Sequence, residues 1–169
     1  MLLIKNGRVV DGATGRDEIA DVAVIGNKIV AAEKNLDIER VKAMYDVLES
    51  DIQIIDATGL VVAPGLVDTH VHFRDPGFTY KEDIETGAAA AARGGFTTVV
   101  CMANTKPVVD DVKVLNYIQA QGEKTPIHVL QTATVTVGMK GEELVDMDAL
   151  EEAGAAGFTD DGLPILNEA

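Results

Sequence analysis

Beyond residue 65 the chain alternates between short apolar runs and stretches with helical patterning. Strand–helix units in series form parallel strands, because each helix carries the chain back over the sheet before the next strand begins. Apolar strands of this kind are typical of sheets that are covered on both faces. The predicted strands, in order, are LVDTHVHF, TTVVCMA, IHVLQTATVT and AAGFTDDG, and the predicted helices between them are KEDIETGAAAAARGG, DVKVLNYIQAQ and DMDALEEAG. Such a series builds either a doubly wound sheet or a (β/α)8 barrel, and in both folds functional groups gather at the carboxyl ends of the strands.

The first 64 residues have a different pattern and read as a separate β-rich part. The run DVAVIGNKIVAAE predicts a hairpin whose two-residue turn is Gly26-Asn27. Apolar residues at helical spacing follow in IERVKAMYDVLES, and strand patterning returns in IQIIDATGLVVAPG. We therefore predict a domain boundary that separates residues 1–64 from residues 65–169.

The balance of charges excludes two classes of partner. The formal net charge is −14, so no basic patch is available to neutralise the phosphates of nucleic acid or of an anionic membrane.

The single cysteine, Cys101, cannot form an internal disulfide, which fits a reducing compartment. The apolar residues before Lys5 are too few for a signal peptide, and no apolar run reaches the length of about 18 residues that a membrane span needs. We expect a soluble, cytoplasmic protein.

Two of the three histidines lie in the segment GLVDTHVHFRDPG, at the end of the first predicted strand. Residues i and i+2 of a strand point to the same face, so His70 and His72 should face the same way as Asp68 and Arg74. Two imidazoles about 6–7 Å apart along a strand can converge on one cation, and a metal with an open position can activate water. The alternative is that both histidines are ordinary hydrogen-bonded strand residues. Their shared face, at the carboxyl end of a parallel strand, favours a metal site.

A third ligand is expected from another strand end. The sequence FTDDG offers Asp160 and Asp161, which point to opposite faces of a regular strand, so only one of them should face the site. Spacing alone does not choose between them, and Asp-Asp-Gly is also a common turn signal. Asp68 lies one layer deeper, which indicates an interior hydrogen-bonding group. His128 opens the third strand at its opposite end, so we predict a structural role for it.

Two further polar residues are placed to reach the same strand ends. Arg74 could bind a substrate carboxylate through two parallel hydrogen bonds, or it could form a surface ion pair with one of the many acidic residues. Asn104 ends the second strand in CMANTKP, where an asparagine serves either the site or a turn. Cys101 lies in the same apolar strand, which predicts a buried and inert thiol.

Three segments carry a resemblance to a known family. PGLVDTHVHFRDPG, ETGAAAAARGGFTTVVCMANTKPV and EAGAAGFTDDG, in this order, resemble the amidohydrolase superfamily and within it the bacterial class I dihydroorotases. The resemblance implies the N-terminal part of a (β/α)8 barrel, about four βα units, preceded by part of a small β-sandwich domain. It also implies a hydrolase that interconverts N-carbamoyl-L-aspartate and L-dihydroorotate in pyrimidine biosynthesis with one or two zinc ions.

The same resemblance assigns roles to individual residues. His70 and His72 would ligate the more buried zinc, and Asp161 would be the carboxylate ligand. His72, Arg74 and Asn104 would contact the substrate, the last two through its α-carboxylate. The family's further histidine ligands and its general acid/base aspartate would lie beyond Ala169, so no catalytic residue is expected within this chain. A barrel of this type takes about 250 residues, and we therefore expect the chain to be an N-terminal fragment with no activity of its own.

The resemblance leaves alternatives open. The loop Met102-Ala103-Asn104-Thr105 lacks the proline usual in the family, although it keeps the asparagine. Hydantoinases, dihydropyrimidinases and allantoinases share the His-x-His strand, but the first two typically use a carboxylated lysine where GAAGFTDDG has none. A third reading is a non-catalytic homologue that serves as a structural partner. A homo-oligomer is expected, and aspartate transcarbamoylase is the alternative partner.

Overall fold

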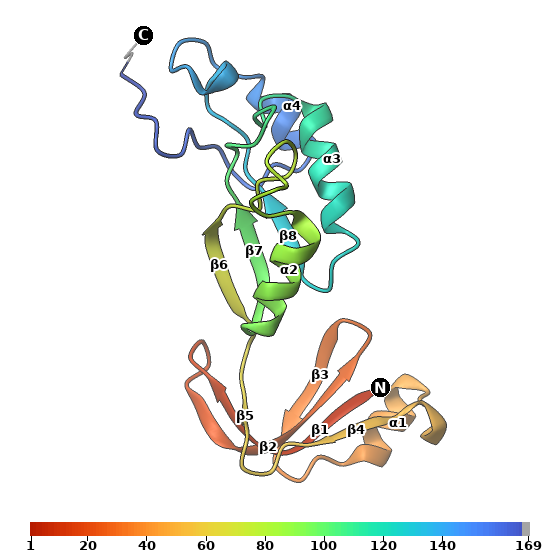
Figure 1. The fold of residues 1–169 in the computed structure, drawn as a ribbon. Helices are drawn as coiled ribbons and strands as arrows, with labels where there is room; N and C mark the ends of the chain where they lie inside the picture. Colours follow the sequence, from red (N-terminus) through yellow and green to blue (C-terminus); the bar gives the residue numbers. More distant parts are fainter. Residues whose placement is uncertain (167–169) are drawn as a thin grey trace. The chain divides into compact units, whose positions relative to one another are not determined.

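The computed structural model describes residues 1–166. The chain divides into two compact units, Met1–Pro64 and Gly65–Ala169 (Figure 1). Both secondary-structure types are present in each unit, so the fold is of the mixed α/β type. No helix among the described residues is long and apolar enough to cross a membrane.

The first unit is built around a five-stranded sheet. Its strands follow the order β3-β2-β1-β4, and β5 pairs with β1 beyond the end of β4. The predicted hairpin is confirmed: β2 and β3 are antiparallel and are joined at Gly26-Asn27, where Gly26 has a φ of 59°. The elements are β1 (Leu2–Asp11), β2 (Arg16–Ile25), β3 (Lys28–Glu33), α1 (Ile38–Tyr45), the 3-10 helix η1 (Glu49–Asp51), β4 (Gln53–Asp56) and β5 (Val61–Val62).

The helix predicted over IERVKAMYDVLES is shorter than its apolar spacing indicates. It ends at Tyr45, because Asp46 adopts the left-handed conformation with a φ of 51° and its backbone N–H bonds to the Lys42 carbonyl. Aspartate is one of the few residues with a side chain that tolerates this conformation, which closes many helices. The remainder of the predicted helix contains only η1.

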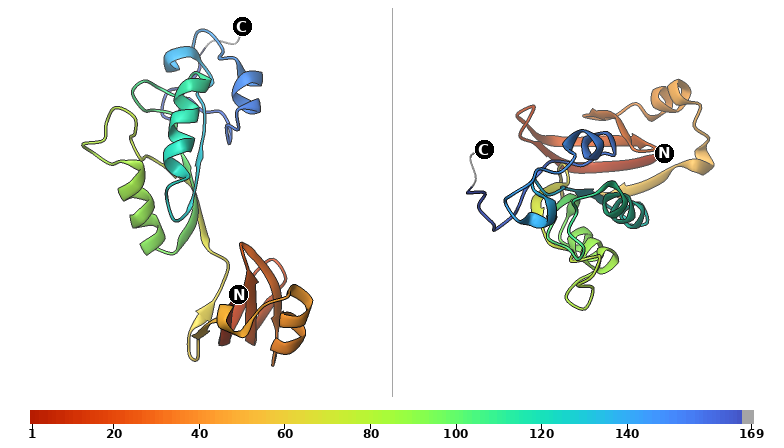
Figure 2. Two further views of the ribbon diagram at one scale, coloured as in Figure 1. Left: turned by 90° about the vertical axis from the view of Figure 1, so that its right-hand side faces the viewer. Right: turned by 90° about the horizontal axis from the view of Figure 1, so that it is seen from above.

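The second unit is a parallel sheet of three strands in the order β6-β7-β8. Its helices α2 and α3 pack against each other and against the sheet, on β7 and β8 respectively (Figure 2). Each helix begins after an aspartate whose carboxylate accepts the backbone N–H three residues on, as the N-cap preference predicts. The elements are β6 (Leu66–Val71), α2 (Ile84–Arg93), β7 (Phe96–Cys101), α3 (Val112–Gly122), β8 (His128–Gln131), the 3-10 helix η2 (Val137–Met139) and α4 (Met147–Glu152).

The fourth strand predicted over AAGFTDDG does not form among the described residues. Phe158 makes only an isolated parallel bridge with Ala133, supported by backbone hydrogen bonds such as Thr159 N–H to the Ala133 carbonyl at 2.9 Å. The ladder stops there because the next N–H groups, those of Val135 and Thr136, donate to a side-chain carboxylate instead. The third strand is shorter than IHVLQTATVT because it ends at Gln131, opposite Cys101, the last residue of its partner β7.

Candidate metal centre

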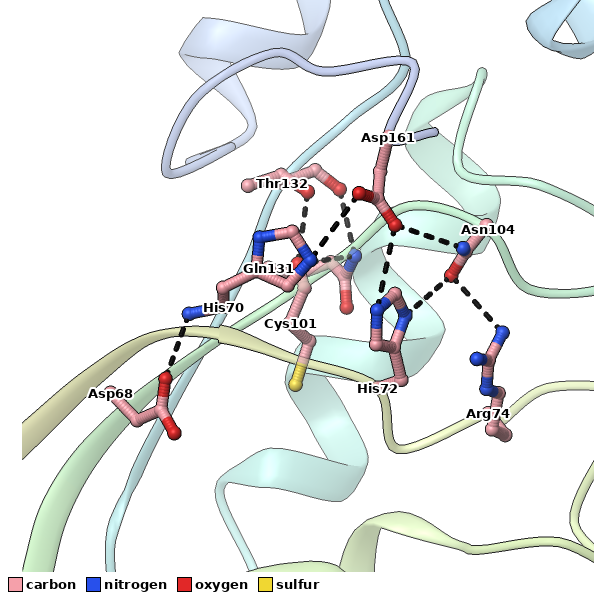
Figure 3. A network of polar contacts seen from close by, with 9 residues as sticks. All are labelled: Asp68, His70, His72, Arg74, Cys101, Asn104, Gln131, Thr132 and Asp161. Atoms are coloured by element: carbon pink, nitrogen blue, oxygen red, sulfur yellow. Dashed lines mark hydrogen bonds and ion pairs between the residues drawn. The ribbon is translucent and has the colours of Figure 1, made fainter. Parts of the chain in front are cut away.

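The strand β6, which contains His70 and ends one residue before His72, is irregular around His70. In β6, Asp68 pairs with Val99 and Val71 pairs with Cys101, so three steps along β6 match only two along β7. Bulges of this kind re-aim side chains next to functional sites. The prediction of one shared face from Asp68 to Arg74 assumed a regular strand and is therefore wrong in detail. The Asp68 carboxylate accepts the His70 backbone N–H at 3.0 Å, so Asp68 supports the bulge and is not one of the converging ligands (Figure 3).

Two imidazoles and one carboxylate converge beyond the end of β6. His70 Nε2 lies 3.3 Å from Asp161 Oδ1, and His72 Nε2 lies 3.5 Å from Asp161 Oδ2. One ligand atom from each of these three residues lies within 4.8 Å of the others. Two ligands held about 2.1 Å from one zinc ion at tetrahedral angles stand about 3.4 Å apart. The donor types and their spacing therefore fit a zinc ion, and the three predicted metal ligands are brought together.

The side chains of the three predicted ligands differ in their exposure to solvent, as expected for a metal site that is open on one side. The His70 side chain is 56% exposed, whereas those of His72 and Asp161 are 27% and 18% exposed. The two imidazole rings meet edge to face, with centroids 5.2 Å apart. A metal held here would be enclosed on the His72 and Asp161 side and accessible past His70.

The structure separates the roles of the two neighbouring aspartates. Asp160 is 7% exposed, and its carboxylate accepts hydrogen bonds from the backbone N–H groups of Val135 and Thr136, at 2.8 and 3.2 Å, and from the Thr136 hydroxyl. Asp161 points to the histidines. The expectation that only one aspartate faces the site is met, and Asp160 instead fixes the loop after β8 to the turn that carries Asp161.

Asn104 connects the predicted metal ligands to Arg74. Its Nδ2 donates to Asp161 Oδ2 at 3.1 Å, and its Oδ1 lies 2.9 Å from His72 Nδ1 and 3.4 Å from Arg74 Nη1 (Figure 3). The residues predicted to contact substrate thus lie directly beside the predicted metal ligands. A guanidinium and an amide at the edge of a metal site can hold an anionic group while a neighbouring bond is cleaved.

The loops that carry Arg74 and Asn104 are held together by their backbones. The Lys106 N–H donates to the Pro76 carbonyl at 3.0 Å. Gly77 has a φ of 93°, and a Cβ on it would stand 2.1 Å from the Lys106 carbonyl oxygen. Only glycine permits both the conformation and the close approach.

Other residues singled out in the sequence lie away from the ligands. His128 is exposed and opens β8, at the end of the strand opposite to the metal ligands. Cys101 is buried, and this burial raises the pKa of its thiol to about 12, which fits the predicted inert role.

Sequence reasoning missed Gln131, which is 2% exposed and donates to the carbonyls of Cys101 and Thr132. Its position as a polar residue inside an otherwise apolar predicted strand could have identified Gln131 from the sequence.

Comparisons with known proteins identify the family of the chain. The family model described as Dihydro-orotase-like matches residues 59–169. The dihydroorotase of Clostridioides difficile is 56% identical over 167 residues, and that of Streptococcus thermophilus is 54% identical over 167 residues; each match covers 99% of this chain and 37% of the relative. The chain thus spans about 37% of the length of these curated relatives.

Solved structures of similar fold include two hydantoinases. An L-hydantoinase (dihydropyrimidinase) from Arthrobacter aurescens is 26% identical with a TM-score of 0.73, and the match covers 93% of this chain and 32% of that one. A D-hydantoinase is 31% identical with a TM-score of 0.62, over 89% of this chain and 29% of that one. The fold seen here therefore recurs as part of larger proteins.

Proposed function

The chain belongs to the dihydroorotase-like family, and we propose that the whole protein is a zinc-dependent dihydroorotase that interconverts N-carbamoyl-L-aspartate and L-dihydroorotate in pyrimidine biosynthesis. The observation that carries this proposal is the convergence of His70, His72 and Asp161 at spacings suited to one zinc ion. The adjoining Arg74 and Asn104 supply the groups that an anionic substrate needs. The names of the two dihydroorotase relatives support the choice of substrate.

The proposal extends to the fold of the whole protein. A (β/α)8 barrel would continue the parallel series β6-β7-β8, and a small β-sandwich would contain the sheet of the first unit. Support comes from the sequential order of the strands and from the likeness to the larger hydantoinase structures. In such a barrel the histidines would stand at the carboxyl-terminal mouth, where active sites of this fold form.

Each residue of the site has a distinct task in the proposed reaction. His70, His72 and Asp161 would hold the metal, and one or two zinc ions would supply Lewis-acid polarisation of the amide carbonyl and a nucleophilic water at neutral pH. Arg74 would bind the substrate α-carboxylate through its planar guanidinium, with Asn104 donating an N–H beside it. His72 lies between these groups and the metal position, so it would also contact the substrate. The general acid/base is expected outside these residues.

Zinc content tests the proposed site directly. We expect the chain to bind zinc and the double variant His70→Ala, His72→Ala to lose it, because two of three ligands are removed. His128→Ala is the matched control and should keep the zinc content of the parent. Elemental analysis after dialysis gives the stoichiometry, and circular dichroism checks that the variants fold. Unchanged zinc in a folded double variant would refute the site.

A hydantoinase-type activity is the second candidate, because the similar solved structures carry that name. The identity to these structures is 26% and 31%, against 56% and 54% for the dihydroorotases, so the second candidate fits at the level of the superfamily. Assaying the whole protein with dihydroorotate and with hydantoin separates the two. Activity on neither substrate would favour a non-catalytic structural partner.

We also propose a cytoplasmic location and a homo-oligomeric assembly, with aspartate transcarbamoylase as the alternative partner. The single cysteine fits the proposed location, and the expected pathway supports the choice of the transcarbamoylase as the alternative partner. Light scattering of the whole protein, alone and mixed with a purified transcarbamoylase, tests them. A monomer that does not change in mass in the mixture would exclude both associations.

A further inference from the structure

The orientation of the Asn104 side-chain amide is determined by two partners whose chemistry is unambiguous. Ionised Asp161 can only accept hydrogen bonds, and the Arg74 guanidinium can only donate them. Asn104 presents Nδ2 to Asp161 Oδ2 at 3.1 Å and Oδ1 to Arg74 Nη1 at 3.4 Å. Rotating the amide by 180° would place oxygen against the carboxylate and N–H against the guanidinium. Both contacts would be repulsive, so the amide has one stable orientation.

This orientation decides which nitrogen of His72 carries the proton. Asn104 Oδ1 lies 2.9 Å from His72 Nδ1, and an amide oxygen only accepts. His72 Nδ1 must therefore donate, which leaves the lone pair of neutral His72 on Nε2. The competing arrangement would have Nε2–H donate to Asp161 Oδ2 at 3.5 Å, a longer contact than the 2.9 Å between Nδ1 and Asn104 Oδ1, and would require the unfavourable amide rotation.

We propose that Asn104 is a positioning residue that holds His72 as the Nδ1–H tautomer and, through Nδ2, orients the carboxylate of Asp161. The Nε2 lone pair of His72 and the oxygens of Asp161 then point in fixed directions toward the proposed metal position. The positioning role rests on the proposed metal-dependent function. The tautomer itself is a property of the metal-free chain. In metal proteins the partner of the non-ligating ring nitrogen fixes the tautomer and ring orientation in this way.

The hydrogen-bond capacity of Asn104 allows this task and substrate binding together. The amide offers two acceptor lone pairs and two N–H donors. The lone pairs serve His72 and Arg74, and one N–H serves Asp161, so three of the four sites are used. The remaining N–H can donate to a substrate carboxylate held by Arg74. Asn104 would therefore link substrate binding to the geometry of two metal ligands.

Nitrogen-15 NMR of the histidine rings tests the tautomer. The chain has three histidines, so ¹⁵N-histidine labelling gives three ring spin systems, which single His→Gln variants assign. Spectra are recorded without metal near pH 9, well above the ordinary histidine pKa of about 6.5. We expect His72 as Nδ1–H and His128, which is exposed, as the Nε2–H form that free histidine prefers. Magic-angle spinning gives the same shifts if the chain associates.

Two substitutions separate positioning from mere packing. Asn104→Leu has nearly the same shape but no acceptor, so His72 should revert to Nε2–H. Asn104→Asp keeps an acceptor for Nδ1 but removes the donor to Asp161, so the tautomer should stay. Zinc affinity, measured with a competing chelator, should fall about 10–100-fold in both variants. Asn116→Leu, on an exposed position of α3, is the control and should change neither readout.

The outcomes distinguish this inference from the proposed function. Nε2–H on His72 in the parent chain, or Nδ1–H retained in Asn104→Leu, would refute the tautomer assignment. Zinc affinity unchanged in both variants would refute the positioning role. Nδ1–H on His72 in a parent chain that binds no zinc would uphold the tautomer assignment but refute both the proposed metal function and the purpose assigned to Asn104.

Discussion

Arg74 combines an uncommon backbone conformation with a side chain directed at the site. Its φ is 59°, in the left-handed region that few residues with a Cβ occupy. Such conformations cost about 1–3 kcal/mol and persist only where the surroundings enforce them, often at functional sites. Here the Phe78 N–H donates to the Arg74 carbonyl at 2.9 Å and closes the turn. The turn directs the guanidinium to Asn104 and away from the surface ion pair that the sequence left open.

Replacing Arg74 by lysine tests whether this geometry serves the substrate. Lysine keeps the charge but loses the planar fork, so one charge-assisted hydrogen bond of about 1.5–3 kcal/mol should be lost. We expect kcat/KM of the whole protein for dihydroorotate to fall about 10–100-fold, with zinc content unchanged. Arg93→Lys, exposed at the end of α2, is the matched control. Parent-like kcat/KM in Arg74→Lys would remove Arg74 from the site.

At the scale of elements, the sequence predicted the helices, strands and turns that depend on the pattern of neighbouring residues. The three parallel strands, the three helices that follow them along the chain and the Gly26-Asn27 hairpin all follow from periodicity and turn chemistry. Spacing also placed the two histidines at a strand end. The choice of Asp161 came only from the resemblance, because it depends on contacts of Asp160 with residues 24 and 25 positions earlier. Those same contacts keep the fourth strand from extending beyond its single bridge, which no local pattern reveals.

The contact between the two site loops gives a prediction at this scale. Gly77→Ala would force a Cβ within 2.1 Å of the Lys106 carbonyl oxygen, in addition to the cost of a positive φ. The control Gly95→Ala has a similar φ, 87°, but nothing within 4 Å of the added Cβ. We expect urea unfolding to show a loss of about 1 kcal/mol for Gly95→Ala and clearly more for Gly77→Ala. Equal losses would mean that the loops do not pack as described.

At the scale of the whole molecule, the second unit exposes apolar surface on its sheet. Leu66 and Val67 on β6 are 53% and 58% exposed, and Leu130 on β8 is 44% exposed. Among the described residues β6 pairs only with β7, so its other edge has free backbone donors and acceptors. Such an edge favours association with another chain. The net charge of −14 opposes association, but charge repulsion is screened over about 8 Å in physiological salt, whereas edge pairing is a contact interaction.

The isolated chain of residues 1–169 is therefore expected to associate and to be inactive. Association should follow because pairing the β6 edge with another copy satisfies its backbone groups and buries Leu66 and Val67. Inactivity should follow because the proposed metal-binding residues (His70, His72 and Asp161) and the proposed substrate-binding residues (Arg74 and Asn104) leave the general acid/base unassigned among residues 1–166. Light scattering and a ring-opening assay with added zinc measure the two properties on one sample. A monodisperse monomer would contradict the first expectation, and zinc-dependent turnover would contradict the second by requiring a proton-transfer group among residues interpreted here as structural.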